Sequence, residues 1–246
     1  METVFRQTHT LSAIHTDRYG RLKPSAILFL AQDAADKHCS TLSLDWKTLA
    51  SRGLFWAVVR HRVQITRLPE IGEAVTVETW PMPTTRSAFP RATAAYDAQG
   101  RELFRCISLW ILMDNQTRAM VVPGKSGIVL KGQLQGTELP PPSSIVPKAS
   151  ENFATRQVCF TDLDRNGHMN NTRYLDWIDD LLPSRFHCPH PVREFTVCYL
   201  SEAREGQTMR LNYQVTDGPF LQVDGYRTEA DSAKPEERIF SAQIIF

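Results

Sequence analysis

The two halves of the chain repeat one pattern of turn, helix and strand hairpin, and this repeat limits the folds open to it. Asp17-Arg-Tyr-Gly matches Asp164-Arg-Asn-Gly at an offset of 147 residues, and in each half a segment with the helical spacing of apolar residues follows. A second match joins the turns that end at Gly72 and Gly206, with an offset of 134 residues. Because both matches keep the same order, we favour a duplicated unit over chance similarity within an unrepeated α+β protein.

Each half is expected to contain a helix followed by four strands. Residues 5–16 alternate loosely and predict an opening strand, and Pro24 suits the first turn of a helix over residues 25–39. Alternating runs bounded by turn residues predict the remaining strands. They cover 56–67, 73–80, 87–96 and 103–113 in the first half, and 193–200, 207–215, 221–227 and 238–246 in the second.

The expected domains are residues 1–130 and residues 153–246, joined by a linker over 131–152. The linker is rich in Pro, Gly, Ser and Gln, and it includes the run Leu-Pro-Pro-Pro-Ser-Ser at 139–144. The fold class is therefore α+β: two antiparallel sheets, each wrapped around its helix, which we expect to lie side by side as one continuous sheet.

Composition excludes several classes of function. A net charge of +1 gives no general signal for nucleic acid or membrane binding. The five cysteines are odd in number and scattered, which favours a reducing compartment over a disulfide framework. The sequence shows neither a signal or transit segment nor a run of about 18 apolar residues. We expect a cytoplasmic protein without a membrane span.

The stretch over residues 160–182 places three reactive side chains, Asp164, Asn166 and His168, within five positions. Their alternation is typical of an extended segment and would point all three to one side. An amphipathic helix is expected next, up to Pro183. Its apolar positions are Tyr174, Leu175, Trp177, Ile178, Leu181 and Leu182.

The two halves differ at the polar positions. Tyr19, Arg21 and Leu68 take the places of Asn166, His168 and Glu202, so the polar set is present only in the second half. A fold needs its core in both copies, whereas a reaction needs one site, and this asymmetry indicates that Asp164, Asn166, His168 and Glu202 are catalytic. The alternative is that they are turn and helix-cap residues, in which Asp, Asn and Gly are common.

No metal or cofactor is expected. Asp162-Leu-Asp-Arg-Asn-Gly resembles half of a calcium loop, but Arg173 stands where a bidentate Glu is required. His187-Cys-Pro-His190 lacks the paired spacing of a zinc site and is interpreted as a loop. The absence of a GxSxG motif and of a Gly-rich phosphate loop argues against α/β-hydrolase and nucleotide chemistry.

The segment Asp162-Leu-Asp-Arg-Asn-Gly-His-Met-Asn-Asn-Thr-Arg-Tyr174 closely resembles the signature of acyl-acyl-carrier-protein thioesterases, the plant FatA/FatB type and its bacterial relatives. Residues 56–81 and 109–118 also resemble that family, and the similarity runs over nearly the whole chain. The resemblance implies a double hotdog fold and hydrolysis of fatty acyl-carrier-protein thioesters, which ends fatty acid synthesis. Without a transit segment, the chain resembles a bacterial member.

The family's Asp, Asn and His fall on Asp164, Asn166 and His168, and its Glu falls on Glu202. Ala203 stands where the family usually has Cys, which argues against a Cys nucleophile here. Asp164 would activate water or attack the carbonyl, His168 would carry protons, Asn166 would position the substrate or the Asp, and Glu202 would orient water or His168. Free N–H groups of a helix that begins near Asn170 would hold the oxyanion.

The resemblance also implies an acyl tunnel in the first half and an acidic carrier protein as partner; a homodimer is a further expectation. The candidate tunnel residues, which could also be ordinary core, are Ile27, Leu28, Leu30, Ala31 and Trp56. The candidate carrier-binding residues, which could also be a solvated strand face, are Arg60, Arg62, Arg67, Arg204 and Arg210. The alternative functions are an acyl-CoA thioesterase and a non-catalytic acyl-binding sensor, although no DNA-binding segment accompanies the chain.

Overall fold

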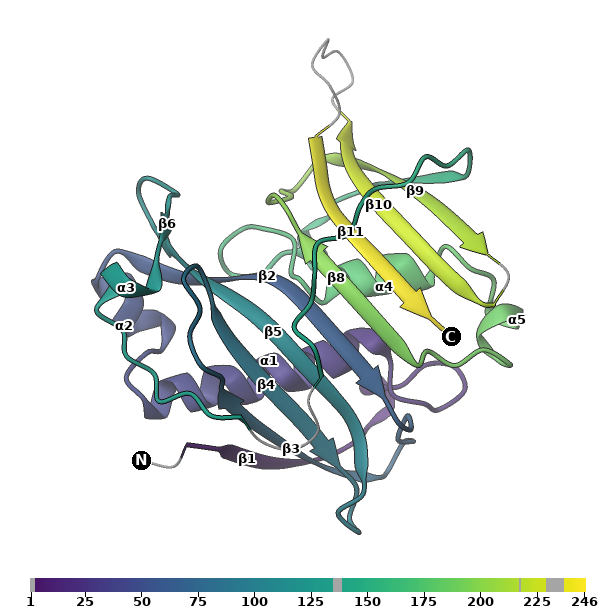
Figure 1. Cartoon of the computed structure of the whole chain (residues 1–246). Coiled ribbons are helices and arrows are strands. Elements are labelled where there is room, and N and C mark those ends of the chain that lie inside the picture. Colours follow the sequence, from purple (N-terminus) through teal and green to yellow (C-terminus); the bar gives the residue numbers. More distant parts are fainter. Residues whose placement is uncertain (1–2, 135–138, 217, 229–236) are drawn as a thin grey trace. The chain divides into compact units, whose positions relative to one another are not determined.

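The computed structural model describes residues 3–134, 139–216, 218–228 and 237–246 (Figure 1). It contains two compact units, Met1–Pro142 and Ser143–Phe246. Of the expected linker, residues 135–138 lie outside the described residues. Its described parts, 131–134 and 139–152, contain no helix or strand.

The first unit is an antiparallel sheet with one long helix. The sheet order is β1-β3-β4-β5-β2, and β6 pairs with β5. Its strands are β1 (Phe5–Thr10), β2 (Leu54–Ile65), β3 (Ala74–Pro81), β4 (Phe89–Tyr96), β5 (Glu102–Asp114) and β6 (Met120–Val121). Its helices are α1 (Pro24–Thr41), α2 (Trp46–Ser51) and α3 (Pro123–Ser126), with a 3-10 turn at Ala13–His15.

The second unit repeats this topology with the order β7-β9-β10-β11-β8. Its strands are β7 (Phe153–Gln157), β8 (Glu194–Tyr199), β9 (Thr208–Thr216), β10 (Phe220–Thr228) and β11 (Glu237–Ile245). Its helices are α4 (Arg173–Asp179) and α5 (Ser184–His187), with a 3-10 turn at Phe160–Asp162. The predicted strands of both halves are therefore confirmed, with ends shifted by one or two residues except at β1, which stops at Thr10.

The duplication extends to single backbone bridges. In the first unit Thr16 bridges Leu22 and Arg21 bridges Glu70; in the second, Leu163 bridges Met169 and His168 bridges Arg204. In each pair, the first bridge closes the segment before the helix on itself, and the second ties that segment to the turn between the next two strands. Both units are thus helix-wrapping antiparallel sheets, the arrangement of a hotdog fold.

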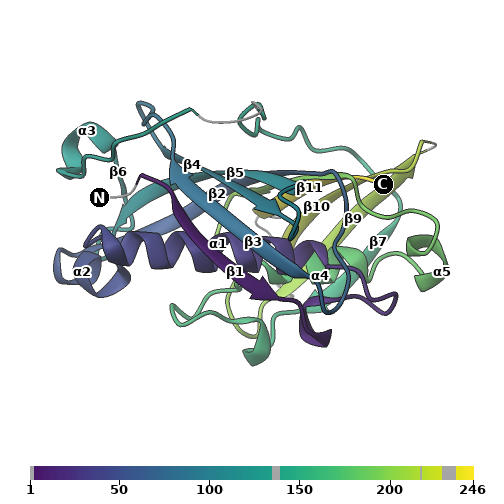
Figure 2. The ribbon, with the colours of Figure 1, turned by 90° about the horizontal axis from the view of Figure 1, so that it is seen from below.

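Helix α1 lies along one face of the first unit's sheet (Figure 2). Pro24 occupies its first turn, where a missing N–H costs nothing, as predicted. One side of the helix is buried, including Ile27, Leu28, Leu30, Ala31, Ala34 and Ala35. This apolar stripe, with the spacing expected of a helix packed on a sheet, positions α1 over the strands.

Helix α4 is shorter than its sequence pattern predicts. It ends at Asp179, and Leu181 and Leu182 close the end with 3-10-type bonds to the carbonyls of Ile178 and Asp179. Pro183 disfavours a helical conformation at the residue before it and has no N–H to donate, so the chain turns and starts α5. The 3.6-residue period identified the buried face of this helix but extended it by one turn too many.

Several short elements were not predicted. The first is α2, which Asp45 caps by accepting hydrogen bonds from the N–H groups of Lys47 and Thr48. The other four are α3, α5, β6 and β7. All five have six residues or fewer, which is too short for a periodic signal.

One buried histidine links β2 and β5, two neighbouring strands of the first unit. His61 on β2 lies opposite Ser108 on β5, and its Nδ1 is 2.8 Å from the Ser108 hydroxyl. Only 1% of His61 is exposed. Burial lowers its pKa to about 3, because the imidazolium would lose its hydration.

We expect His61 to make the protein sensitive to acid. The unfolded chain, with a His pKa of about 6.5, binds a proton between pH 6.5 and 3 that the folded chain does not, so stability falls as the pH is lowered through this range. Between pH 7 and pH 4 the wild type should lose about 3 kcal/mol more than His61→Gln. Urea unfolding at several pH values measures this difference. Parallel curves for the two proteins would contradict it.

Candidate active site

Asp164, Asn166 and His168 lie in a tight turn, not on an extended segment as the alternation predicts. The Asp164 Oδ1 accepts the backbone N–H of Asn166 at 2.8 Å and that of His168 at 3.4 Å. The Asp164 N–H donates to the His168 carbonyl, and Gly167 has a φ of 75°. The prediction of an extended segment is wrong because a carboxylate that accepts two N–H groups folds the chain back on itself, and Gly167 permits the left-handed conformation.

The same turn occurs three times in the part of the chain that the structure describes, each time with the pattern Asp-x-x-Gly-x. In the first unit Asp17 Oδ1 accepts the N–H groups of Tyr19 and Arg21. Between β4 and β5, Asp97 Oδ1 accepts those of Gln99 and Arg101. The carboxylate of Asp164 therefore has a structural role that is independent of any reaction.

The last position of the turn separates the second unit from the other two cases. Arg21 and Arg101 reach back and form ion pairs with the Asp of their own turns, at 3.0 and 2.7 Å. His168 instead has its Nε2 3.0 Å from the Oε2 of Glu202. The side chain at the last position of the turn therefore pairs with its own turn where it is Arg, and with Glu202 where it is His168.

The backbone holds His168 and Glu202 together. Besides the bridge between His168 and Arg204, the Met169 N–H donates to the Ala203 carbonyl at 2.8 Å. The His168 side chain is 16% exposed and the Glu202 side chain 39%, so the pair is open to a substrate. A carboxylate beside an imidazole fixes its orientation and supports its protonated form, which suits proton transfer.

Asn166 is exposed and does not join the pair. Its Nδ2 is 3.3 Å from Asp164 Oδ2. The structure therefore brings the side chains of His168 and Glu202 together, and separately those of Asp164 and Asn166.

The helix after the turn begins later than expected, at Arg173. Three N–H groups that were expected to be free already have acceptors: Asn170 donates to the Asp162 carbonyl, Thr172 to the Asn170 side chain and Arg173 to the Asn170 carbonyl. These three groups are therefore not free to hold an oxyanion, and the expected role of the other N–H groups at the helix start stays a prediction.

Tyr174 is a neighbour of the site that the sequence marked only as core. It is 3% exposed, and its ring packs against Tyr199 and Phe240. Burial and, to a smaller extent, the negative charge of Asp164 raise the pKa of Tyr174. The helical period locates this ring inside, but no sequence signal places its hydroxyl within the field of Asp164.

Cys198, His187 and His190 make contacts with backbone carbonyls. Ala203, at the family's Cys position, is buried, and Cys198 is buried with its thiol donating to the Ser143 carbonyl at 3.4 Å. The rings of His187 and His190 contact the backbone carbonyls of Asp179 and Phe186. Among the described residues, no group of three His, Cys, Asp or Glu side chains is placed to hold a metal. In that same part of the chain, no helix is long and apolar enough to cross a membrane.

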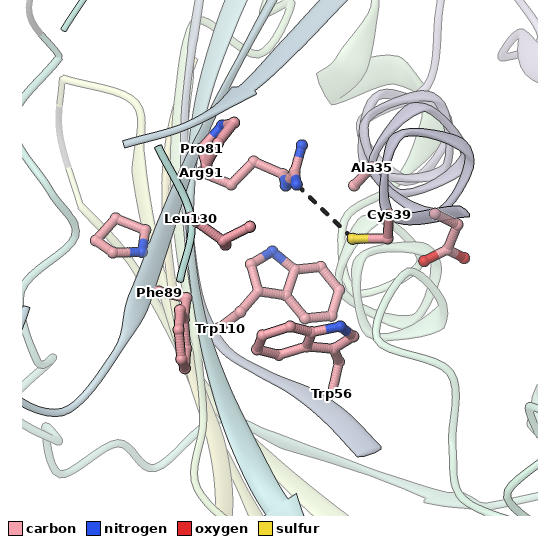
Figure 3. Close-up of a pocket in the computed structure, with 10 residues that line it drawn as sticks. Ala35, Cys39, Trp56, Pro81, Phe89, Arg91, Trp110 and Leu130 are labelled. Carbon is pink, nitrogen blue, oxygen red and sulfur yellow. Dashed lines mark hydrogen bonds between the residues drawn. The ribbon is translucent and has the colours of Figure 1, made fainter. Parts of the chain in front are cut away.

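Of the residues expected to line the acyl tunnel in the first unit, four lie in the core and one lines a cavity. Ile27, Leu28, Leu30 and Ala31 are almost fully buried in the core. Trp56 lines a cavity between α1 and the sheet (Figure 3). The other main walls of this cavity are Cys39, Phe89, Arg91, Trp110 and Leu130. Helical spacing identifies the side of α1 that is buried but does not show which of its residues face a void.

The arginines proposed to bind the carrier protein occupy both units. Arg67 forms an ion pair with Glu73 at 2.8 Å, and Arg204 lies 3.6 Å from Glu202. Arg60 donates to the Pro142 carbonyl, and the Arg210 guanidinium lies over the Phe153 ring. Because a carrier protein would have to compete with these contacts, the expected role of the arginines stays a prediction.

Comparison with known proteins identifies relatives of the whole chain. The acyl-ACP thioesterase N-terminal domain matches residues 2–123, and the acyl-ACP thioesterase C-terminal domain matches residues 146–243. A dodecanoyl-acyl-carrier-protein hydrolase of Cinnamomum camphora is 24% identical over 87% of this chain. A palmitoyl-acyl carrier protein thioesterase of Gossypium hirsutum is 25% identical over 76%. The chain spans 60% and 49% of the lengths of these two relatives.

Solved structures show the same fold. An acyl-ACP thioesterase from Bacteroides thetaiotaomicron superimposes with a TM-score of 0.89 over 99% of this chain and 97% of its own, at 22% identity. A 12:0-ACP thioesterase from Umbellularia californica superimposes with a TM-score of 0.83 over 100% and 97%, also at 22% identity. Both likenesses confirm the double hotdog fold. With both domains matched in order, this chain belongs to the acyl-ACP thioesterase family.

Proposed function

We propose that the protein hydrolyses the thioester of a fatty acyl-carrier protein and releases the free fatty acid, which ends fatty acid synthesis. The observation that carries the proposal is the contact between His168 and Glu202, at 3.0 Å, at a turn that is self-contained in the first unit. Membership of the family and the activities in the names of its plant relatives support this reaction class. We place the reaction in the cytoplasm, since all five cysteines are free thiols. A homodimer stays a prediction.

In the proposed mechanism His168 carries the proton. Thioester hydrolysis needs water to lose a proton and the leaving thiolate to gain one. The Glu202 carboxylate would accept a hydrogen bond from the Nε2–H group of His168. This contact favours the tautomer in which Nδ1 carries no proton and can act as a base. Glu202 then stabilises the imidazolium that forms while water attacks.

We assign Asp164 and Asn166 to positioning. The Asp164 Oδ1 accepts two backbone N–H groups and Oδ2 contacts the Asn166 amide, and these contacts stabilise its charge and reduce its strength as a nucleophile. Asp164 therefore holds His168 opposite Glu202, and the exposed Asn166 contacts the substrate. The acyl chain is proposed to lie in the first unit, against Trp56, Phe89 and Leu130.

The carrier distinguishes the nearest alternative, an acyl-CoA thioesterase, which would use the same residues. A non-catalytic sensor would not need a paired His and Glu, so the contact between His168 and Glu202 favours an enzyme. We retain the acyl-carrier protein as substrate because it is named in the relatives that match both units.

Replacing His168 by Arg, the residue at the equivalent position of the first unit, tests the catalytic pair. In His168→Arg, the new side chain can pair with Asp164 as Arg21 pairs with Asp17, so the variant should fold. Its rate of thiol release from acyl-carrier protein should fall roughly 100- to 10,000-fold, the usual contribution of a general acid–base group. Arg21→His is the matched control and should keep wild-type activity within about threefold, below 1 kcal/mol. A loss smaller than about tenfold in His168→Arg would reject the assignment.

Replacing the two equivalent aspartates, one at a time, distinguishes the structural role of the turn from its role in the reaction. Asp17→Ala and Asp164→Ala each remove two backbone hydrogen bonds to a carboxylate, and each should cost about 1–3 kcal/mol of unfolding free energy in urea. Only Asp164→Ala should also reduce thiol release, because it frees His168. Equal activity in the two variants would show that Asp164 does not position the pair.

Isotope transfer distinguishes water attack from covalent attack by Asp164. After a single turnover in oxygen-18 water, the label should be in the released fatty acid and not in the Asp164 side chain, as read by peptide mass spectrometry. Label in Asp164 would require an acyl-anhydride intermediate and would overturn the positioning role.

A further inference from the structure

The residue bridged to His168 across the backbone differs in charge between the two units. In the second unit this residue is Arg204, whereas in the first unit the equivalent bridge joins Arg21 to Glu70. Both units keep the bridge and the order of their strands, so the fold accepts either charge at this position. A cation here is therefore particular to the unit that holds the contact between His168 and Glu202.

Arg204 lies against the same carboxylate oxygen as His168. Its Nη2 is 3.6 Å from Glu202 Oε2, and His168 Nε2 is 3.0 Å from that oxygen. Because both distances end on one atom, the two nitrogens are no more than about 7 Å apart, close enough for their charges to interact at a protein surface. An arginine stays charged at every pH at which an enzyme is assayed, so Arg204 is a fixed positive charge beside the imidazole.

The backbone holds Arg204 beside the pair. Its N–H donates to Gln207 Oε1 at 2.8 Å, and the carbonyl of the preceding residue, Ala203, accepts the Met169 N–H at 2.8 Å. The Arg204 side chain is 62% exposed, so water and ions screen its charge in part. The effect expected on His168 is therefore modest, and substitution of this exposed side chain should leave the fold intact.

Glu202 and Arg204 act on the His168 ring in opposite directions. A neighbouring carboxylate favours the protonated imidazole, and a neighbouring cation disfavours it. In the proposed reaction His168 has to be neutral before it can take a proton from water. The charge of Arg204 thus allows Glu202 to orient His168 while offsetting part of the carboxylate's tendency to keep the ring protonated.

Other ionisable groups of the second unit lie in the two bridged turns and in the segments beside them. Among the described residues they are Asp162, Asp164, Arg165, Arg173, Tyr174 and Glu205. Asp164 accepts the His168 backbone N–H, and Arg173 forms an ion pair with Asp162 at 3.3 Å. Substitution at position 204 leaves all six in place and changes one charge only.

We propose that Arg204 is a positioning residue that sets the pH at which His168 becomes available as a base. It acts through its charge and through the Glu202 carboxylate that it shares with His168, without touching the substrate. This inference rests on the proposed function, in which His168 takes a proton from water.

A series of charges at position 204 tests this role through the pH dependence of kcat/KM for thiol release. In Arg204→Gln the acid limb should move to higher pH by about 0.5 unit, because loss of the cation stabilises the imidazolium. The rate on that limb then falls about threefold, and the plateau at high pH is unchanged. Arg204→Glu, which copies Glu70 of the first unit, should shift the limb about twice as far. Arg204→Lys keeps the charge and should keep the wild-type limb.

Arg185→Gln is the matched control, because it removes the same charge at the other end of β8. Arg185 lies on α5, where the neighbouring Phe186 packs against Phe246 beside the start of β8, whereas Glu202 follows the end of that strand. Six residues of strand span about 20 Å, roughly two Debye lengths at 0.1 M salt, so the limb of this variant should coincide with that of the wild type.

Two kinetic outcomes would overturn the role of Arg204. One is a limb that does not move in Arg204→Gln, or that moves to lower pH. The other is an equal shift in Arg204→Gln and Arg204→Lys, since the effect would then not follow the charge. A uniform loss of rate with an unchanged midpoint falls under the first outcome and would assign Arg204 to carrier binding only.

Direct titration separates this inference from the proposed function. Nuclear magnetic resonance of the histidine rings measures the pKa of His168 without substrate, and His168→Arg identifies its signal. The pKa should be higher in Arg204→Gln than in the wild type by about 0.5 unit. That increase in a protein that hydrolyses no thioester would reject the hydrolase proposal and leave the effect of Arg204 on His168 standing. An active enzyme without the increase would overturn this inference alone.

Discussion

The carboxylate of Asp164, bonded to the backbone N–H groups of Asn166 and His168, is the interaction on which the second unit's site depends. It folds five residues into a turn, and the end of that turn sets the direction of the His168 side chain. Where the last residue is Arg, as at Arg21 and Arg101, the side chain returns to the turn. Where it is His, the side chain is too short to return in this way, and it reaches Glu202 instead. The difference between Arg and His at the last position of the turn thus decides whether the turn is purely structural or supplies one partner of the candidate reactive pair.

Duplication explains why the two units have diverged. Both keep the sheet order and the paired backbone bridges, because each must cover its own helix. The second unit holds the contact between His168 and Glu202, and the first holds a cavity with a buried guanidinium. A helix of 18 residues over the first sheet leaves room for a lined cavity, whereas α4 has seven residues, and Pro183 follows it closely. The division of labour that we propose, with chemistry in one unit and the chain in the other, follows from this difference.

The sequence predicted the large features and missed the local ones. The strands along the chain and the start of α1 at Pro24 were predicted, because periodicity and proline geometry are local signals. The repeat also selected His168 and Glu202 by their absence from the first half, although their contact is shown only by the structure. The turn at Asp164 was mistaken for an extended segment because the alternation of polar residues does not show that the Asp164 carboxylate accepts the N–H groups of the residues that follow it. The Arg91 cavity was missed because the pattern of β4 marks a residue as buried without showing what it faces.

The central claim, that the protein is a hydrolase and that its carrier is a protein, is tested most directly by thiol release. Acyl chains from C8 to C18 would be presented on acyl-carrier protein and on coenzyme A at equal low concentrations. The account predicts release with a clear preference for the carrier protein and a maximum at one chain length. Equal or faster release from the coenzyme A esters would make it an acyl-CoA thioesterase. Tight acyl binding without release from either carrier would contradict the account and indicate a sensor.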